Sequence, residues 1–280
     1  MSASMSFAGK TAVITGAASG IGRALAEALA ERGCNLALAD VNEAGLADVA
    51  QALASNEIRV TTHRVDVGDK AAITDFADAV RRDHGAAHLL FNNAGVALGG
   101  QFEDIAEDDF EWLIDINFWG PIRMTRAFLP LMRESGEGHI TNISSIFGVI
   151  APAGQTAYSA AKFGVRGFSD ALRHEMADSD ISVTTVHPGG VNTSIAKSAR
   201  MPASASQEEI DRGLKQAADN LVMPPPKAAD IILRGVERRR PRVLVGRDAH
   251  LLHWIERLWP SNYWGIMKKR LSSAADAEQA

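Results

Sequence analysis

The sequence predicts an α/β fold of three layers, in which a doubly wound parallel sheet of about seven strands carries helices on both faces. Three observations predict it. Short apolar runs alternate along the chain with amphipathic stretches at helical spacing. The runs are apolar throughout, as strands buried on both faces of a parallel sheet are. A glycine-rich turn joins the first run to the first amphipathic stretch, as in sheets of this type.

The elements expected from this alternation follow one another with short connections. The expected strands and helices, in chain order within each class, are strands at 11–15, 36–39, 58–65, 89–91, 140–143 and 183–186 and helices at 21–32, 43–54, 70–82, 110–132 and 158–176. No linker rich in proline, glycine or serine interrupts them before about residue 195. One domain over residues 7–250 is therefore predicted.

Two late stretches depart from this rhythm. Residues 194–223 hold no clean strand and end before three consecutive prolines, so we expect a partly helical insertion there. Residues 251–280 are expected to form an amphipathic C-terminal extension rather than a separate domain. Its apolar, tryptophan-bearing helix is interrupted by Pro260.

Composition narrows the class of protein. A chain of 280 residues with 46% hydrophobic and 22% charged residues can bury the core of one large domain. The formal net charge of −5, without a clustered basic surface, argues against nucleic-acid binding. The only cysteine, Cys34, excludes an internal disulfide, and its place at the start of a strand indicates a buried thiol. The N-terminus is too polar for a secretory signal and no run of ~18 apolar residues occurs, so a cytoplasmic protein is expected.

The glycine-rich turn spans residues 15–22 and has the spacing Gly16, Gly20 and Gly22, with Ser19 and Ile21 inside it. Glycines let the backbone approach a pyrophosphate closely, and the helix that follows offers free N–H groups and the positive end of its dipole. A purely structural turn is the alternative. The position after the first strand and before a helix favours a dinucleotide site and a Rossmann-type fold.

Asp40 ends the second expected strand, a little over 20 residues after the glycine turn begins. A carboxylate there can accept hydrogen bonds from both ribose hydroxyls of adenosine and would repel a 2′-phosphate. A helix N-cap or a loop aspartate is the alternative interpretation of this residue. Ser19 and Val41 supply no cation for a phosphate, and Arg64 on the next strand is the nearest basic candidate. NAD is therefore predicted as cofactor, with NADP less favoured.

Tyr158 and Lys162 are four residues apart in a helical stretch, so both side chains lie on one face. A free tyrosine ionises near pH 10 and is a poor base at neutral pH. A lysine ammonium and an oxidised nicotinamide nearby would lower that pKa. The tyrosine could then exchange a proton with an alcohol oxygen while a hydride moves to or from the cofactor. A tyrosine and a lysine at this spacing are common in helices, so the other motifs of the chain decide whether the pair is catalytic.

The chain resembles the short-chain dehydrogenase/reductase family from about residue 7 to residue 245. Besides residues 15–22, the resemblance rests on Asn117 in the long helix and on motifs at the ends of successive strands: Asp66-Val67, Asn92-Asn93-Ala94-Gly95, Asn142-Ile143-Ser144-Ser145 and Pro188-Gly189-Gly190-Val191-Asn192-Thr193. Ligands bind at these strand ends in doubly wound sheets. The resemblance implies an enzyme of the CH–OH dehydrogenase or ketone reductase type.

The family's residue roles carry over to matching positions. The resemblance implies a catalytic tetrad of Asn117, Ser145, Tyr158 and Lys162, in which Ser145 rather than Ser144 binds the substrate oxygen and Asn117 holds a relay water. Asp66 would bind the adenine amino group, and Asn93 would fix the adenosine side. The full set of implied cofactor-binding residues is Gly16, Ser19, Gly20, Ile21, Gly22, Asp40, Asp66, Val67, Asn93, Ala94, Gly95, Tyr158, Lys162, Pro188, Gly189, Val191 and Thr193. No metal site is expected.

The substrate side of the pocket is expected to be apolar, and an apolar secondary alcohol or ketone is the predicted substrate. Ser145, Phe147 and Tyr158 are the predicted substrate-binding residues, and residues 194–223 are expected to close over the substrate. The residues expected to line the rest of the pocket are Val96, Ala97, Leu98, Ile146 and Val149. Lys197 and Arg200 could meet a carboxylate or a phosphopantetheine group, although solvated cations are the simpler interpretation.

Other functions and partners stay open. One alternative is a 3-oxoacyl carrier-protein or coenzyme A thioester reductase that uses NADPH, and another is a cofactor-sensing protein without catalysis. The resemblance implies a homodimer or homotetramer in which the helices bearing Asn117 and Tyr158 pair. In the extension, Leu251, Trp254, Ile255, Leu258 and Trp259 form one stripe, with Trp264, Met267, Lys268, Lys269 and Arg270 beyond it. The stripe could pack on the protein or lie on a membrane surface.

Overall fold

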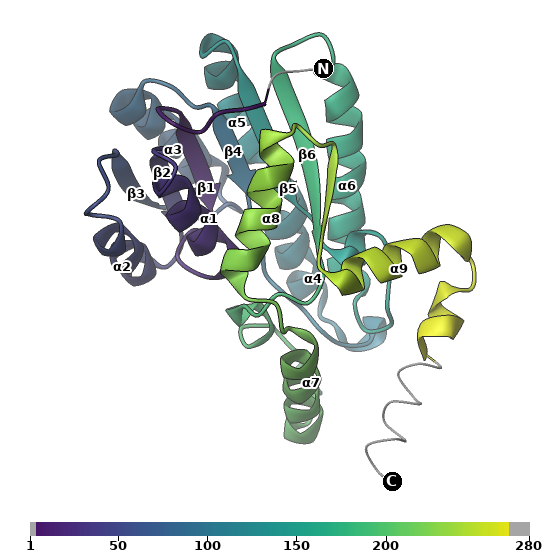
Figure 1. The fold of residues 1–280 in the computed structure, drawn as a ribbon. Helices are drawn as coiled ribbons and strands as arrows, with labels where there is room; N and C mark the ends of the chain where they lie inside the picture. The colour runs from purple at the N-terminus through teal and green to yellow at the C-terminus, as the bar shows by residue number, and fades with distance from the viewer. Residues whose placement is uncertain (1–3, 269–280) are drawn as a thin grey trace.

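The computed structural model describes residues 4–268, and its centre is a parallel sheet of seven strands. The strands run in the order β3-β2-β1-β4-β5-β6-β7 (Figure 1). Their bounds are β1 Thr11–Thr15, β2 Asn35–Asp40, β3 Val60–Arg64, β4 Leu89–Asn92, β5 Gly138–Ile143, β6 Ile181–Pro188 and β7 Arg242–Val245. The predicted fold class is confirmed, and the order reverses between β1 and β4, where doubly wound sheets bind their ligands.

Helices cover both faces of the sheet. Their bounds are α1 Gly20–Ala30, α2 Glu43–Ala52, α3 Lys70–His84, α4 Glu107–Ile114, α5 Gly120–Glu134, α6 Thr156–Glu175, α7 Gln207–Asn220, α8 Pro225–Glu237 and α9 Arg247–Leu258. Helices α1 and α8 pack together on one face, and α3, α5 and α6 lie on the other (Figure 1). β1 and β4 are buried at every residue because helices cover both faces of the sheet there, as their apolar sequences predict.

The helix predicted at residues 110–132 is longer than expected and is interrupted. A π-helical turn, Asp115–Trp119, separates α4 from α5 within one continuous helical stretch. The apolar period of the sequence does not reveal such a turn, because it changes the backbone hydrogen bonds over a few residues only. The turn carries Asn117, which is fully buried.

The remaining helical ends follow local sequence signals. Asn42 is the N-cap of α2, and its side-chain oxygen accepts a hydrogen bond from Gly45 N at 3.0 Å. Asp69 caps α3, and Gly85 ends that helix in the left-handed conformation with φ of 73°. Residues 194–223 contain the short 3₁₀ helix Ser194–Ala196 and α7, so the expected partly helical insertion is confirmed.

A buried polar network joins the strands that carry the site. Asn92 Nδ2 at the end of β4 donates to Asn142 Oδ1 on β5 at 2.7 Å, and Asn142 Nδ2 donates to Ser169 Oγ on α6 at 2.9 Å. All three side chains are buried, so a missing partner would leave a polar group unsatisfied. The network therefore holds the register of β4, β5 and α6 beneath the site.

Two further observations concern the class of protein. Cys34 is buried, and burial raises the pKa of its thiol to about 12, as expected for a structural cysteine. Among residues 4–268, no helix combines the length and the apolar character needed to cross a membrane.

Candidate active site

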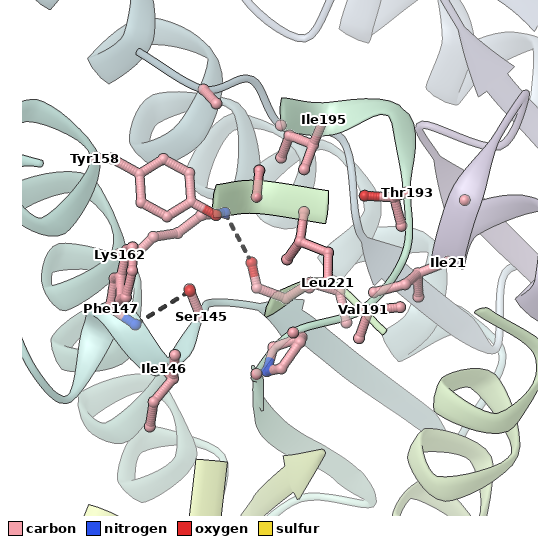
Figure 2. A pocket seen from close by; sticks show the side chains of 18 of the residues that line it. Ile21, Ser145, Ile146, Phe147, Tyr158, Lys162, Val191, Thr193, Ile195 and Leu221 are labelled. Atoms are coloured by element: carbon pink, nitrogen blue, oxygen red, sulfur yellow. Dashed lines mark hydrogen bonds between the residues drawn. The ribbon is translucent and has the colours of Figure 1, made fainter. Parts of the chain in front are cut away.

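A cavity of about 1610 Å³ lies at the carboxyl ends of the strands. Most of the sequence-predicted site residues line it, from the glycine turn to α6 (Figure 2). Two of the predicted residues, Gly22 and Asn117, do not line the cavity. The strand ends thus bring together residues that are up to about 180 positions apart in the chain.

The glycine turn is compact because its glycines touch one another's backbone. A Cβ atom at Gly22 would overlap the carbonyl oxygen of Gly16, and Gly16 itself has φ of 65°. Ser19, the N-cap of α1, makes no side-chain capping bond to any described residue. The first N–H groups of α1 therefore remain available to an anion in the cavity.

Asn93 supports this turn from the neighbouring strand end. Its Nδ2 donates to the carbonyl oxygens of Thr15 at 3.0 Å and Gly16 at 3.2 Å. The Thr15 hydroxyl in turn accepts from the backbone N–H groups of Asn93 and Ala94, both at 3.0 Å. The side-chain amide of Asn93 is thus directed at the protein backbone, so its contribution to a bound adenosine would come through the shape of the turn.

Asp40 lines the cavity at the end of β2 and does not cap a helix. Its Oδ2 accepts from Ala18 N and its Oδ1 from Asn42 N, each at 3.0 Å. The alternative reading of Asp40 as an N-cap is wrong, because Asn42 caps α2. Arg64 lies opposite Asp40 in the β2–β3 register but is exposed and does not line the cavity.

Asp66 and Val67 line the cavity just beyond β3, as predicted. Asp66 Oδ1 accepts from Gly68 N at 2.8 Å, which fixes the carboxylate at the start of the loop that leads to α3. Each carboxylate oxygen can accept a second hydrogen bond. Asp66 therefore retains the capacity to accept from an amino group in the cavity.

Tyr158 and Lys162 lie on one face of α6, toward the cavity (Figure 2). Lys162 is 4% exposed, and its Nζ donates to the carbonyl oxygen of Ile143 at the end of β5, at 3.1 Å. The same Nζ lies 5.5 Å from the centroid of the Tyr158 ring. The spacing of four residues thus places an ammonium group beside the phenol, as predicted.

Burial acts on both groups. Desolvation lowers the pKa of Lys162 to about 8, because a buried ammonium loses water contacts that one carbonyl only partly replaces. Desolvation also raises the pKa of Tyr158, and a hydrogen bond with Ser145 opposes that rise. The pKa of Tyr158 is thus raised by burial and lowered only by Ser145, so the lowering expected from Lys162 is not seen in the chain by itself. Tyr158 is consequently a neutral phenol, able to donate a proton, at neutral pH.

Ser145 lies in the loop after β5, close enough to Tyr158 of α6 for a side-chain hydrogen bond. Its hydroxyl accepts from Phe147 N at 3.1 Å, and the Phe147 ring stands perpendicular to Tyr158 with centroids 6.2 Å apart. Ser144 Oγ donates to the carbonyl oxygen of Lys162 at 2.9 Å, so this serine supports α6 rather than the cavity. The choice of Ser145 over Ser144 agrees with these directions.

His187 is a supporting residue that the sequence patterns do not single out. Its Nδ1 is 2.9 Å from the carbonyl oxygen of Ser145, and desolvation lowers the pKa of the buried imidazole to about 4. The ring is therefore neutral at neutral pH, and Nδ1 carries the proton because a carbonyl oxygen can only accept. His187 thereby fixes the backbone that presents Ser145.

Asn117 lies behind Lys162 in the π-helical turn. Its Oδ1 accepts from Val96 N and its Nδ2 donates to Val96 O, each at 2.8 Å. A Cβ atom at Gly95 would be 3.1 Å from Asn117 Oδ1 and 3.6 Å from Lys162 Nζ. The side chain of Asn117 thus fixes the strand-end loop beside the lysine, and a relay water there remains a proposal.

Asp248 is a second residue that the sequence patterns do not single out. It stands in the first turn of α9, and its Oδ2 accepts from Gly190 N at 2.6 Å. A Cβ atom at Gly189 would overlap the same carboxylate. Asp248 therefore holds the loop of residues 188–193, which carries Val191 and Thr193 to the cavity. Only the fold brings Asp248 close to this loop, since 58 residues separate it from Gly190.

The substrate side departs from the prediction at several positions. Val96, Ala97 and Ile146 line the cavity, but Leu98 and Val149 do not: both are buried in neighbouring clusters, Leu98 1% and Val149 2% exposed. These two positions were wrongly assigned because a run of apolar residues does not show which member faces the core.

Lys197 and Arg200 do not line the cavity either. Arg200 pairs with Asp109 at 2.7 Å, and its guanidinium carbon lies 3.6 Å from the centroid of the Trp112 ring. The interpretation of Arg200 as a ligand in the cavity is therefore wrong, whereas its side chain is 48% exposed, as a solvated cation is. Other parts of residues 194–223 do line the cavity, among them Ile195, Ala217 and Leu221.

The apolar stripe of the C-terminal extension divides in two. Ile255 is buried and lines the cavity, together with Leu251 and Leu252. Trp254 and Trp259 are 55% and 50% exposed, and Leu258 is 60% exposed. Trp264 and Met267 also line the cavity. Lys269 and Arg270, expected to continue the extension, lie outside the described residues.

Comparison with known proteins agrees with this arrangement. The family profile described as short chain dehydrogenase matches residues 10–203. A Mycobacterium tuberculosis protein named as the oxidoreductase SadH is 44% identical over 264 residues, which cover 92% of this chain and 94% of that protein. A Burkholderia phymatum short chain dehydrogenase/reductase, solved in complex with NAD, superposes with a TM-score of 0.85 at 29% identity, over 91% of this chain and 95% of that one.

A further solved structure holds a different dinucleotide. An alcohol dehydrogenase from Thermococcus sibiricus, complexed with 5-hydroxy-NADP, has a TM-score of 0.71 at 25% identity, covering 85% of this chain and 94% of that one. Proteins of similar structure have thus been solved with NAD and with 5-hydroxy-NADP.

Replacing Asp248 tests its part in holding the loop of residues 188–193. In Asp248→Ala, we expect amide hydrogens of the loop to exchange about tenfold faster, the size expected when a charge-assisted hydrogen bond is lost. Hydrogen exchange followed by mass spectrometry measures this. Asp248→Asn keeps an acceptor oxygen and should stay near the wild-type rate. Equal exchange in wild type and Asp248→Ala would contradict the assignment.

Proposed function

The chain belongs to the short-chain dehydrogenase/reductase family, and on that premise we propose that it is an NAD-dependent oxidoreductase that interconverts an apolar secondary alcohol and its ketone. The observation that carries the proposal is the position of Tyr158 and Lys162 in the cavity, opposite Ser145 and next to the glycine turn. A structural Tyr-Lys pair would not need a buried ammonium group facing a large open cavity.

The residues of the cavity fit a nicotinamide dinucleotide. The turn of Gly16 and Gly22 leaves no room for side chains, and the uncapped start of α1 supplies donors for a diphosphate. Asp40 would accept from the adenosine ribose, Asp66 from the adenine, and Thr193 would orient the carboxamide. When bound, the nicotinamide would supply the hydride to a ketone carbon or accept it from an alcohol carbon.

The chain's own residues would manage the proton. In the direction of reduction, Tyr158 Oη donates a proton to the substrate oxygen while Ser145 Oγ donates a hydrogen bond to the same atom. The Lys162 ammonium stabilises the phenolate that forms at Tyr158 and is itself positioned by the Ile143 carbonyl. In the direction of oxidation, the phenolate takes the proton back from the alcohol.

The lining of the substrate side supports an apolar substrate. Ile146, Phe147, Leu251 and Leu252 face the space next to Ser145 and Tyr158. The thioester reductase alternative would be helped by a cation at this side. Arg200, the candidate for that role, is instead engaged with Asp109 and Trp112.

Tyr158→Phe tests the catalytic role against that of a silent cofactor-binding protein. We expect the variant to lose at least about a thousandfold in turnover, because the phenol that donates the proton to the substrate oxygen is removed, while NADH binding measured by fluorescence stays within about twofold. The activity assay follows NADH absorbance over a panel of secondary alcohols and ketones. Retained turnover in Tyr158→Phe would refute the mechanism, and a wild type silent on the whole panel would favour the cofactor-sensing alternative.

The pH dependence tests the role of Lys162. Its pKa of about 8 leaves the ammonium charged below that pH and neutral above it. We expect ketone reduction to be constant below pH 8 and to fall about tenfold per pH unit above it, as the charge beside Tyr158 is lost. Initial rates at saturating NADH measure the profile. A rate that stays level to pH 9.5 would show that the charge of Lys162 is not required.

The choice between NAD and NADP is tested at Asp40. Asp40→Asn removes the charge that would repel a 2′-phosphate but keeps an oxygen that can accept from Ala18 N. We expect the ratio of kcat/KM for NAD over NADP to fall about tenfold, mainly through better use of NADP. Asp69→Asn, a helix-capping position away from the cavity, serves as control. An unchanged ratio would remove Asp40 from cofactor selection.

A further inference from the structure

The C-terminal segment of residues 247–268 folds back over the cavity. It lies beyond residues 10–203, the part that the family profile matches, so the family resemblance does not assign it a role. Helix α9 starts at the end of β7, and the chain after it turns back in a further helical turn (Figure 1). The segment thereby reaches the side of the cavity opposite α1.

Specific contacts hold this segment against the loop after β5. The Tyr263 hydroxyl accepts a hydrogen bond from Ala151 N at 3.0 Å. Leu252, Tyr263 and Met267 pack on a cluster around the loop residues Ile146 and Ile150. This loop also carries Ser145 and Phe147, so the segment is fixed to the same structural unit as the substrate-binding residues.

The face that the segment turns to the cavity is apolar beyond the first turn of α9. Leu251, Leu252, Ile255, Trp264 and Met267 line the cavity, and no charged residue of the segment after Asp248 does so. Across from them, Phe147, Pro152 and Ala153 complete an apolar space next to Tyr158. Such a surface would bind hydrocarbon and would discriminate against charged groups.

The size of the cavity leaves room for more than the cofactor. Pockets for a single small ligand usually measure roughly 300–1,000 Å³, whereas this one measures about 1610 Å³. A second hollow of about 620 Å³ adjoins it, lined by Phe163 and Ala160 among others. Trp264, with Pro152, Ala153 and Gln155, borders both spaces. Trp264 has the largest side chain of these four residues, so it places the most bulk between the two spaces.

We propose that residues 247–268 form the outer wall of the substrate site and select an elongated, uncharged alcohol or ketone, with Trp264 setting the length of hydrocarbon that fits. The proposal rests on the proposed function, since it names the substrate class of the same site. The reacting carbon lies at Tyr158 and Ser145, and the hydrocarbon chain runs beneath α9 toward Trp264.

A homologous series of methyl ketones from 4 to about 14 carbons tests the proposal with the full-length protein and NADH. We expect kcat/KM to rise about fourfold for each added methylene until the chain meets Trp264, and then to level off or fall. In Trp264→Ala the two hollows join, so the optimum should move to ketones at least two carbons longer. The rate on the shortest ketone should change less than twofold.

Matched variants separate the wall from a general effect on stability. Trp254→Ala removes an exposed indole of α9 that does not line the cavity, and its length profile should match wild type. Leu251→Trp adds bulk at a residue that lines the cavity and is 48% exposed, so the optimum should move to shorter ketones. If Trp264→Ala fails to fold, as judged by thermal melting, Leu251→Trp decides the question.

Calorimetric binding of the longest ketone to the protein–NADH complex reports on the wall without turnover. Weaker binding in Leu251→Trp but not in Trp254→Ala would support the wall even if no ketone is reduced, an outcome that refutes only the proposed function. A length profile and a ketone affinity that are the same in wild type, Trp264→Ala and Leu251→Trp would overturn the inference.

Discussion

The arrangement of the site depends on one constraint: the ammonium group of Lys162 is buried, and a buried charge needs hydrogen-bond partners. Its direct partner is the carbonyl oxygen of Ile143, the last residue of β5. Lys162 can reach this oxygen only if α6 crosses the end of β5 at close range. The position of α6 then places Tyr158 over the cavity.

The contacts around Lys162 maintain that approach. Ser144 bonds the backbone of Lys162, and Asn142 bonds Ser169, about two turns further along the same face of α6, so β5 and α6 are joined at several levels. On the other side, Asn117 fixes the loop at Gly95 close to the ammonium group. Because these groups are buried and polar, each requires its hydrogen-bond partner. Losing a partner would cost free energy, and this restricts β5 and α6 to a narrow range of relative positions.

The side of the cavity that a ligand would contact differs from the buried polar contacts around Lys162, because it offers backbone donors at one end and apolar surface at the other. The glycine turn and the start of α1 offer backbone donors to a charged ligand, whereas Phe147, Leu252 and Trp264 offer apolar surface. The two ends of the cavity therefore suit the two halves of a hydride transfer, a polyanionic dinucleotide and a hydrocarbon substrate. Asp248 links them, since it belongs to the C-terminal segment but holds the loop of Thr193.

The sequence by itself determined the alternation of strands and helices, the glycine turn, Asp40 at the end of β2, and the pair Tyr158 and Lys162. These features depend on neighbours within one or two turns of chain, where spacing and residue type carry the physical information. The sequence did not predict the π-helical turn at Asn117, because the turn leaves the spacing of the apolar residues almost unchanged.

Only the tertiary structure decided which apolar residues face the cavity and which face the core, as Leu98 and Val149 show. It also decided that Arg200 is engaged by Asp109 and Trp112, that Asp248 holds the loop after β6, and that Trp264 borders the cavity. Each of these depends on contacts between segments that are far apart in the chain. Such contacts follow from how helices and loops pack around the sheet, and no local spacing in the sequence encodes them.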